Sequence, residues 1–131
     1  IGNTDWSVPG RHNLKLLKLN DHLKVTPFVV PYDFDYSGFV NTFYSIPGER
    51  LGIDDVRERL FQGICCTCEE YETTIQEFLD KKDSIYQTIL EFEYFEDRTR
   101  NEVLTYIDEF FSIIESDNLI SRNIINSCKK L

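Results

Sequence analysis

The sequence predicts an α+β fold that is mostly α, in which a small β-hairpin region precedes about four packed helices. Residues 12–19 and 23–30 are rich in apolar and β-branched side chains and flank a polar turn, which is typical of paired strands. From residue 53 onward, apolar residues recur at the three- and four-residue spacing of amphipathic helices. The 131 residues suffice for one domain with a hydrophobic core. We therefore expect a single domain, with a loop and hairpin over 1–52 and a helical subdomain over 53–131.

The charge is divided unevenly between these two regions. Residues 1–52 contain five acidic and five basic side chains, whereas residues 53–131 contain eighteen acidic and nine basic ones and so carry the whole net charge of −9. Nucleic-acid binding needs a basic face, so this balance argues against DNA or RNA as a partner. A solvated helix surface is the simplest account of the acidic half. No apolar run approaches the roughly 18 residues of a membrane span, so we expect no span in this chain.

The hairpin is expected to turn at Asn20-Asp21-His22, and Pro27 marks an edge or a bulge in the second strand. If the turn centres near its middle residue, the numbers of facing residues sum to about 42. Asn13 then lies opposite Val29. The preceding residues 1–13 are rich in Gly, Asn, Ser and Pro, which predicts a structured loop.

The connection over residues 39–52 is aromatic and then turn-like, and a first helix is predicted over residues 53–63. Asp54 and Asp55 suit the first turn of that helix, where negative charge meets the positive end of the helix dipole. Gly63 can end it, because glycine adopts the left-handed conformation common after a helix.

A second, longer helix is predicted from a capping box formed by Thr67 and Glu70. Its apolar stripe consists of Tyr71, Ile75, Phe78, Leu79, Ile85, Tyr86, Ile89 and Leu90. Asp97 is a plausible cap for the next helix, and Ser116 or Asp117 caps a last short one. Stripes of this kind are far more often core than cofactor pocket, so we expect them to pack together.

The candidate site lies just past the second strand. Asp33 and Asp35 follow the apolar run that ends at Val30, and acids at i and i+2 of an extended chain point the same way. Two carboxylates this close repel each other unless a cation lies between them, and a hard cation such as Mg²⁺ takes oxygen ligands. The hairpin brings Asn13 to the same end, and the loop with Asp5 can fold over it. Alternatively, one of the two acids caps a turn, as Asp often does.

The motifs IGNTDWS, HN and VPYDFDYSG resemble the catalytic core of atypical protein-kinase-like phosphotransferases, such as the CotH spore-coat kinases and the HipA-type kinases. Those proteins carry an Asn-x-Asp loop, an Asn on the strand that follows, and an Asp after a hydrophobic strand. The whole chain is similar to an uncharacterised family of Bacteroidetes proteins with this core and a comparable helical tail. The motif match covers about residues 1–38, and a looser likeness extends to the end.

The resemblance implies a fold like the C-lobe of a protein kinase, and a phosphotransferase that uses Mg²⁺ and ATP on an acceptor. Asp5 matches the catalytic aspartate, which orients or deprotonates the acceptor hydroxyl. Asn13 matches the amide that holds a metal ion, Asp33 matches the metal-binding aspartate, and Asp35 is a second carboxylate beside it. His12 either orients the loop, as the histidine near a kinase catalytic aspartate does, or has a simple structural role.

The sequence departs from the family pattern in three respects. Asp5 and Asn13 are eight residues apart instead of the usual five, and Asp35 stands where ordinary kinases have Gly. There is no Gly-rich nucleotide loop with a phosphate-binding Lys. Since the chain contains no Met, we expect it to be the C-terminal part of a longer protein whose nucleotide-binding lobe lies upstream. The alternative is a non-catalytic helical protein-interaction domain of kinase-like ancestry.

The four cysteines, Cys65, Cys66, Cys68 and Cys128, leave three possibilities open. Cys-Cys-x-Cys is a poor zinc spacing, the thiols can be free, or Cys65 or a neighbour forms a disulfide with Cys128. Such a disulfide closes a loop of some sixty residues and would stabilise the fold by roughly 4 kcal/mol. It would also place the protein outside the cytoplasm. Because members of the similar family look exported, we favour an exported or periplasmic location, with the cytoplasm as the alternative.

Overall fold

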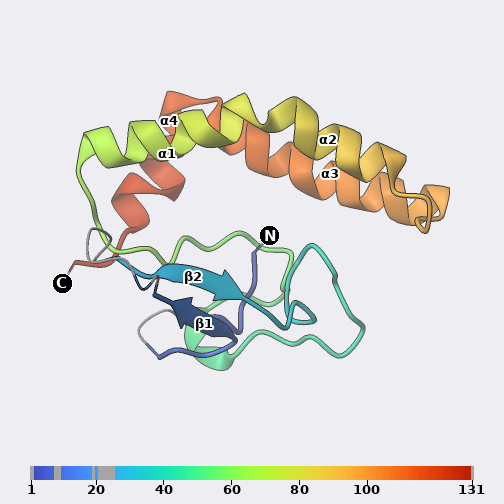
Figure 1. The fold of residues 1–131 in the computed structure, drawn as a ribbon, viewed down its shortest axis with the longest axis horizontal. Coiled ribbons are helices and arrows are strands. Elements are labelled where there is room, and N and C mark those ends of the chain that lie inside the picture. Colours follow the sequence, from blue (N-terminus) through green and yellow to red (C-terminus); the bar gives the residue numbers. More distant parts are fainter. Residues whose placement is uncertain (1, 8–9, 19, 21–25, 131) are drawn as a thin grey trace. The chain divides into compact units, whose positions relative to one another are not determined.

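The computed structural model describes residues 2–7, 10–18, 20 and 26–130. The chain forms two compact units, Ile1–Arg59 and Leu60–Leu131, which we call the hairpin unit and the helical unit (Figure 1). In the described part, a two-stranded antiparallel hairpin precedes four α-helices. The predicted α+β class, mostly α, is therefore confirmed.

The hairpin pairs β1 (Leu14–Leu17) with β2 (Phe28–Pro31), and the numbers of its facing residues sum to 45. The predicted register, with a sum of about 42 and Asn13 opposite Val29, is therefore wrong by three residues. Beyond the paired strands, the backbone carbonyl of Asn13 accepts a hydrogen bond from the N–H of Tyr32 at 3.0 Å. Asn13 thus lies closer to the end of β2 than predicted.

Both strands are shorter than predicted. Pro27 cannot donate a ladder hydrogen bond, so β2 begins at the next residue. Of the predicted turn, only Asn20 is described. Asp21 and His22 lie outside the described residues, as do residues 23–25 of the predicted second strand.

Apolar packing contributes little to the stability of the hairpin. Leu14 is the one buried side chain of its two strands, whereas the side chains of Leu17 and Phe28 are 54% and 49% exposed. An isolated two-stranded hairpin is at best marginally stable in water. Its position therefore depends on hydrogen bonds from the loops on either side.

The predicted helix over residues 53–63 is wrong. This segment is fully described and forms a single turn, which follows a short 3₁₀ helix, η1 (Glu49–Leu51). The Glu58 carboxylate accepts from the N–H groups of Asp54 and Asp55 at 2.7 and 3.0 Å, and the Asp55 carboxylate accepts from the N–H of Arg57 at 2.7 Å. The bond from Arg57 to the Asp55 side chain is an Asx-type turn, a local alternative to helical backbone hydrogen bonding.

The helical unit begins with α1 (Cys68–Asp80), and its capping box is formed as predicted. The hydroxyl of Thr67 accepts from the N–H of Glu70, whose carboxylate accepts from the N–H of Thr67. The predicted long helix divides at Lys81 into α1 and α2 (Lys82–Glu91). Phe78 and Leu79 recur seven residues later as Ile85 and Tyr86, so the apolar stripe stays in phase across the break and does not reveal it.

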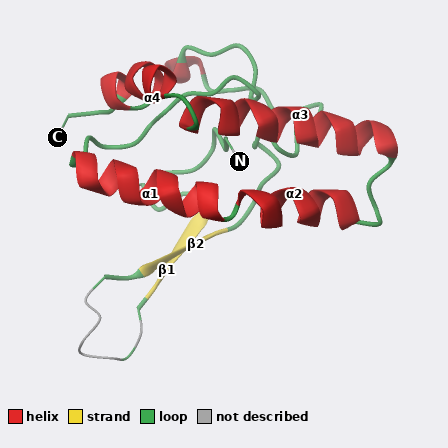
Figure 2. Ribbon diagram, turned by 90° about the horizontal axis from the view of Figure 1, so that it is seen from above, coloured by secondary structure: helices red, strands yellow, loops and turns green. Residues whose placement is uncertain are grey.

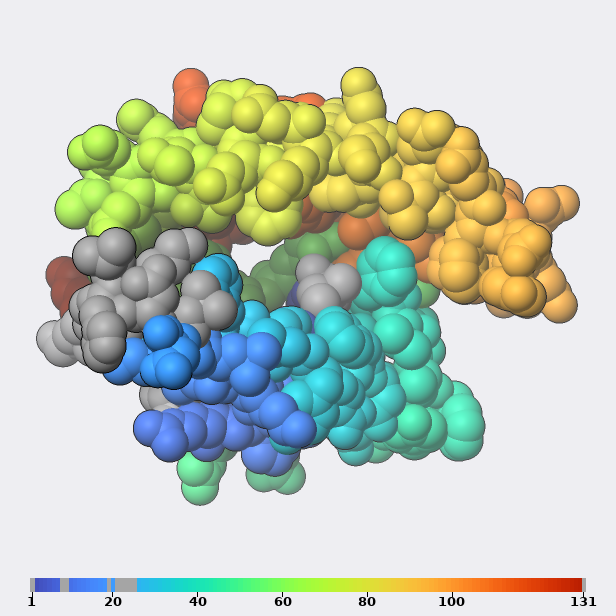
Figure 3. Space-filling view, in the orientation of Figure 1, coloured from blue at the N-terminus to red at the C-terminus, as the bar shows by residue number. Residues whose placement is uncertain are grey.

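The long helix α3 (Asp97–Ile114) runs back beside α2, as Figure 2 shows. It supplies most of the core of this unit, through the buried side chains of Val103, Tyr106, Ile107, Phe111 and Ile114. The cap is Glu96, and the predicted cap Asp97 is the first helical residue. The outer side chains of α1 and α2 form one continuous surface in Figure 3.

The last helix, α4 (Asp117–Asn123), is capped by Ser116, whose hydroxyl accepts from the N–H of Leu119 at 3.5 Å. A short 3₁₀ helix, η2 (Ile125–Ser127), follows it. Within the described part of the chain, no helix combines the length and apolar character needed to cross a membrane.

A disulfide joins Cys65 to Cys128, with Cα atoms 4.9 Å apart. It ties the start of the helical unit to its end, beside a short parallel bridge in which the N–H of Cys65 donates to the carbonyl of Lys129 at 3.0 Å. Cys66 and Cys68 are free and exposed. The predicted disulfide is therefore present, in the Cys65 form.

Candidate functional site

The N-terminal segment carries Asp5 to the end of the hairpin, because residues 2–4 run antiparallel to residues 36–38. The backbone N–H and the hydroxyl of Thr4 both donate to the carbonyl of Tyr36, each at 3.1 Å. Backbone and side-chain hydrogen bonds therefore position the segment that carries Asp5.

Three polar side chains hold Asp5 in one orientation. The side-chain amide of Asn13 donates to Oδ2 of Asp5 at 2.8 Å, and the N–H of Asp5 donates to the side-chain oxygen of Asn3 at 2.8 Å. Nδ1 of His12 lies 2.8 Å from the carbonyl of Asp5, which can only accept, so this ring nitrogen carries the proton. The same nitrogen is 3.5 Å from Oδ1 of Asp5. The structure thus brings the predicted residues Asp5 and Asn13 into direct contact.

The backbone of Asp33 is anchored from the N-terminal loop. Its carbonyl accepts from the side-chain amide of Asn3 at 3.0 Å and from Nε1 of Trp6 at 3.2 Å. Nε1 of Trp6 also lies 3.1 Å from the carbonyl of Tyr32, and its ring packs edge-on against Phe34 with centroids 5.1 Å apart. Asn3 therefore links Asp5 and Asp33 through its two side-chain groups.

Two candidate residues have left-handed backbone conformations, with φ of 53° at Asn13 and 59° at Asp33. This region costs an ordinary L-residue roughly 1–2 kcal/mol, although Asn and Asp tolerate it better than most. Strained positions of this kind cluster at functional sites, where the surrounding structure holds them in place. Here the hydrogen bonds to the Asp33 carbonyl and from the Asn13 amide do so.

Asp35 is held by the aromatic loop that follows it. Its carbonyl accepts from the hydroxyl of Thr42 at 3.0 Å, and its Oδ2 accepts from the hydroxyl of Tyr44 at 3.2 Å. Burial first, and then the hydrogen bond to Asp35, raise the pKa of Tyr44 above its ordinary value of 10.0. The Tyr44 hydroxyl therefore stays protonated and continues to donate to Asp35 at neutral pH.

The two carboxylates interact with each other. A side-chain hydrogen bond with Asp35, followed by the negative charge of Asp35, raises the pKa of Asp33 above its ordinary value of 3.8. The charge of Asp5 contributes in the same direction, more weakly. The predicted acids therefore share one local field, and a proton or a cation would relieve their repulsion.

The described residues contain no group of three or more His, Cys, Asp and Glu side chains arranged to hold a metal ion. The donor set nevertheless suits Mg²⁺, which usually keeps several waters and takes only one or two protein carboxylates. Asp33 and Asp35 would supply the carboxylates. The amide nitrogen of Asn13 bonds Asp5, which leaves its Oδ1 as an oxygen ligand.

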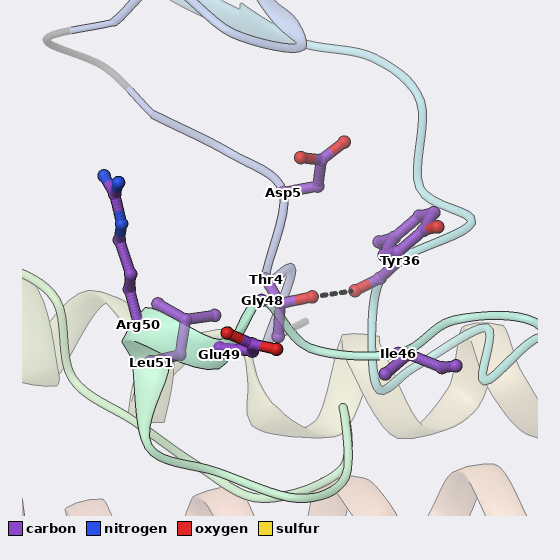
Figure 4. Close-up of a pocket in the computed structure, with 8 residues that line it drawn as sticks. All are labelled: Thr4, Asp5, Tyr36, Ile46, Gly48, Glu49, Arg50 and Leu51. Atoms are coloured by element: carbon purple, nitrogen blue, oxygen red, sulfur yellow. Dashed lines mark hydrogen bonds between the residues drawn. The ribbon is translucent and has the colours of Figure 1, made fainter.

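A cavity of about 570 Å³ opens beside Asp5, entirely within the hairpin unit. Besides Asp5, its wall includes Thr4, Tyr36 and Ile46, together with η1 and the Gly48 that precedes it. In Figure 4, the side chains of Arg50 and Tyr36 stand on either side of Asp5. A small molecule or a side chain in this cavity could reach the Asp5 carboxylate.

Sequence reasoning missed several residues of this site. Asn3 stands two residues before Asp5, a spacing at which an Asn side chain often bonds the backbone, so a local signal existed. Thr42 and Tyr44 reach Asp35 through an irregular loop, and no pattern in the sequence announces that contact. Arg50 lines the cavity with no motif to mark it.

No protein-family model matches the chain, and no curated protein or solved structure matches it either.

Proposed function

We propose that this chain is the metal-binding and catalytic lobe of a kinase-like phosphotransferase that uses Mg²⁺ and ATP. The observation that carries the proposal is the hydrogen bond from the Asn13 amide to the Asp5 carboxylate, 2.8 Å long, at the end of the hairpin that also bears Asp33 and Asp35. Phosphoryl transfer relies on positioning and on charge neutralisation more than on covalent chemistry by the protein. An oriented carboxylate beside an acid pair suits that need.

Asp5 would serve the acceptor. Its Oδ2 is occupied by Asn13, and its Oδ1 lies near His12, at the edge of a cavity large enough for a hydroxylated acceptor. From there the carboxylate can accept the hydrogen bond of an acceptor hydroxyl and take its proton as the oxygen attacks phosphorus. The fixed backbone of the Asn3–Asp5 turn holds the carboxylate in this orientation.

Asn13, Asp33 and Asp35 would hold the metal ion through oxygen atoms. The raised pKa of Asp33 supports this assignment, because the repulsion that raises it is relieved when a divalent cation binds. A bound Mg²⁺ would neutralise charge on the phosphate groups. The glycine-rich loop and the lysine that grip those phosphates would come from a segment before Ile1.

The disulfide between Cys65 and Cys128 supports an exported or periplasmic protein, because disulfides persist in oxidising compartments. The cytoplasm remains the alternative location.

The test uses the intact parent protein, with nucleotide binding followed by calorimetry and γ-phosphate transfer followed directly. Asp5→Asn should bind Mg-nucleotide as before while transfer falls by about 10²–10⁴-fold, the usual contribution of a general base. Asp33→Asn should weaken binding of both Mg²⁺ and nucleotide, and Asp35→Asn should have an intermediate effect. Asp83→Asn, an exposed acid on α2, is the control and should change neither property.

If Asp5→Asn and Asp33→Asn both leave transfer unchanged, the proposal is wrong. In the 131-residue chain alone we expect only weak, millimolar binding of Mg²⁺ and no transfer, because its sequence has no Gly-rich loop with a Lys to bind the ATP phosphates.

The second candidate function is that of a non-catalytic protein-interaction domain of kinase-like ancestry. One observation favours it, a partly apolar groove with an acidic rim in the helical unit. The sequence upstream of Ile1 discriminates between the two functions. A glycine-rich strand-turn-strand, then a Lys and a helical Glu, would favour the phosphotransferase, whereas a chain that starts shortly before Ile1 would favour the interaction domain.

A further inference from the structure

The helical unit contains a groove of about 750 Å³ that does not involve the hairpin unit. One wall is α1, which contributes Tyr71, Ile75 and Leu79, at the i, i+4, i+8 spacing of a single helix face. The other wall is formed by the end of α3, by Ile120 of α4 and by Ile125 of η2.

The apolar face of α1 is incompletely covered. None of its residues is buried, whereas α3 has five buried residues. Ile75 and Leu79 are half-buried in the groove, and Ile125 across from them is 41% exposed. An amphipathic helix normally turns its stripe toward a packed neighbour, so this stripe is open to a further one.

The rim of the groove is acidic. Glu72, Glu115 and Asp117 line it, and none of the described lining residues is basic. Glu115 is paired with Lys82, Oε1 to Nζ 2.5 Å, which leaves the other two carboxylates for a partner. The helical unit as a whole has fifteen acidic and seven basic residues over 60–131, a net charge of −8. Charge complementarity therefore requires a basic occupant.

We propose that this groove binds a basic amphipathic α-helix of a partner protein, independently of phosphoryl transfer. The groove-lining face of α1 spans residues 68–79, about 17 Å or three helical turns. That length suits a helix that lays side chains at i, i+3, i+4 and i+7 into an apolar groove. Lys and Arg side chains that flank the apolar face of the partner helix form ion pairs with the carboxylates of Glu72 and Asp117.

The first test titrates the ¹⁵N-labelled, disulfide-bonded chain with a synthetic amphipathic peptide that has leucines at i, i+3, i+4 and i+7 and lysines on both flanks. We expect NMR shift changes confined to α1, the end of α3, α4 and η2, and a dissociation constant that rises with salt. A peptide of the same composition with the leucines spread around the helix should bind at least about tenfold more weakly. A peptide with glutamates in place of the lysines should not bind.

Two pairs of variants locate the site. Glu72→Lys should weaken binding about fivefold, whereas Glu77→Lys, on the outer face of the same helix, makes the same charge change with a smaller effect. Ile125→Ser should weaken binding about tenfold. Its control, Leu90→Ser, alters a side chain that is 55% exposed and outside the groove, and should leave binding unchanged. Circular dichroism of each variant checks that the helices are intact.

Three results would overturn the proposal. Equal binding of the amphipathic and spread-leucine peptides would mean simple charge attraction. Absence of shifts at α1 would mean that the peptide does not bind in the groove. A concentration-dependent dimer that Ile125→Ser disrupts would mean that a second copy of the chain is the occupant.

Discussion

The hairpin unit and the helical unit are stabilised by different kinds of interaction. In the helical unit, six apolar side chains from α2 and α3 are buried, and a disulfide closes the ends. In the described part of the hairpin unit, the hydrophobic core consists of the side chains of Leu14 and Val56. The conformation of its site depends instead on single hydrogen bonds from Asn3, Thr4 and Trp6 to specific backbone groups.

This difference matters for function. Apolar packing distributes stability over many contacts, each of which is individually weak. Single hydrogen bonds to a strained backbone fix geometry at a few points, which suits a site that must hold carboxylates in set orientations. The chain has one tryptophan, Trp6, so fluorescence reports the hairpin unit while far-ultraviolet circular dichroism reports the helices.

The largest effect is expected from the disulfide. The double variant Cys65→Ser with Cys128→Ser should lose about 4 kcal/mol of stability in the helical unit, because the cross-link restricts a loop of 63 residues in the unfolded state. Urea unfolding followed by circular dichroism measures this loss. The Trp6 signal should change little, since the closed loop contains none of the hairpin unit.

The matched control for this prediction is Cys66→Ser with Cys68→Ser, which removes two exposed thiols and should be nearly neutral. When the denatured, oxidised protein is alkylated, mass spectrometry should show that two of its cysteines are modified. Modification of all four in material made under oxidising conditions would contradict the prediction.

The second effect concerns Arg100 of the helical unit, whose side chain donates to backbone carbonyls as those of Asn3 and Trp6 do in the hairpin unit. The guanidinium of Arg100 donates to the carbonyls of Ile89, Leu90, Phe92 and Phe95, at 2.6 to 3.1 Å. Arg100→Met should cost about 2–3 kcal/mol, because these carbonyls at the end of α2 lose a charged donor. Arg98→Met is the control: Arg98 pairs with Glu102 on an exposed helix surface, and its loss should cost well under 1 kcal/mol. Equal losses in both variants would contradict the assignment.

The sequence predicts most of the helical unit because its signals are local. The capping box of Thr67 and Glu70 and the cap at Ser116 are each formed within three residues of chain. The break at Lys81 was missed because the apolar stripe stays in phase across it, from Phe78 and Leu79 to Ile85 and Tyr86. The helix over 53–63 was wrong, and the segment instead contains a turn in which the Asp55 side chain bonds the N–H of Arg57.

The site was predictable only in part. A loop next to a hairpin brings Asp5 toward Asn13 whatever the register, and so the error of three residues did not separate them. The Tyr44 hydroxyl reaches Asp35 across nine residues of irregular chain, and such a path has no periodic signature. The left-handed backbone at Asp33 also depends on remote donors, which sequence patterns do not show.

The third effect tests whether one hydrogen-bond donor orders the site. Trp6→Phe keeps an aromatic ring beside Phe34 but removes the indole N–H that donates to the carbonyls of Tyr32 and Asp33. A loss of about 1 kcal/mol should make amide exchange in residues 32–37 about fivefold faster, as NMR can measure. Tyr94→Phe, at a 79% exposed position, is the control. Faster exchange in the helices as well would contradict the local effect expected of the indole N–H.

The smallest expected effect on stability is electrostatic. It differs from the others in that the substitution should stabilise the protein. The pKa of Asp33 is raised by its hydrogen bond with Asp35 and by the charge of Asp35, so the folded state binds this proton more tightly than the unfolded chain. That stability is present below the ordinary value of 3.8 and is lost as the pH rises through the raised pKa. Asp33→Asn avoids the loss and keeps a residue that tolerates left-handed backbone. The variant should therefore melt at a higher temperature than the wild type at neutral pH and at the same temperature near about pH 3.

Added Mg²⁺ gives a further test of the difference in melting temperature between the wild type and Asp33→Asn. If Asp33 and Asp35 share a cation, added Mg²⁺ should raise the melting temperature of the wild type and reduce the advantage of Asp33→Asn at neutral pH. Asp83→Asn, exposed on α2, changes the same charge elsewhere and should show neither the pH dependence nor the Mg²⁺ response. The shift should be small, because Asp33 is exposed and water screens its interaction with Asp35. A variant less stable than the wild type at neutral pH would mean that the Asp33 carboxylate caps the turn after β2. Loss of the charge lowers stability only if the carboxylate makes a stabilising contact.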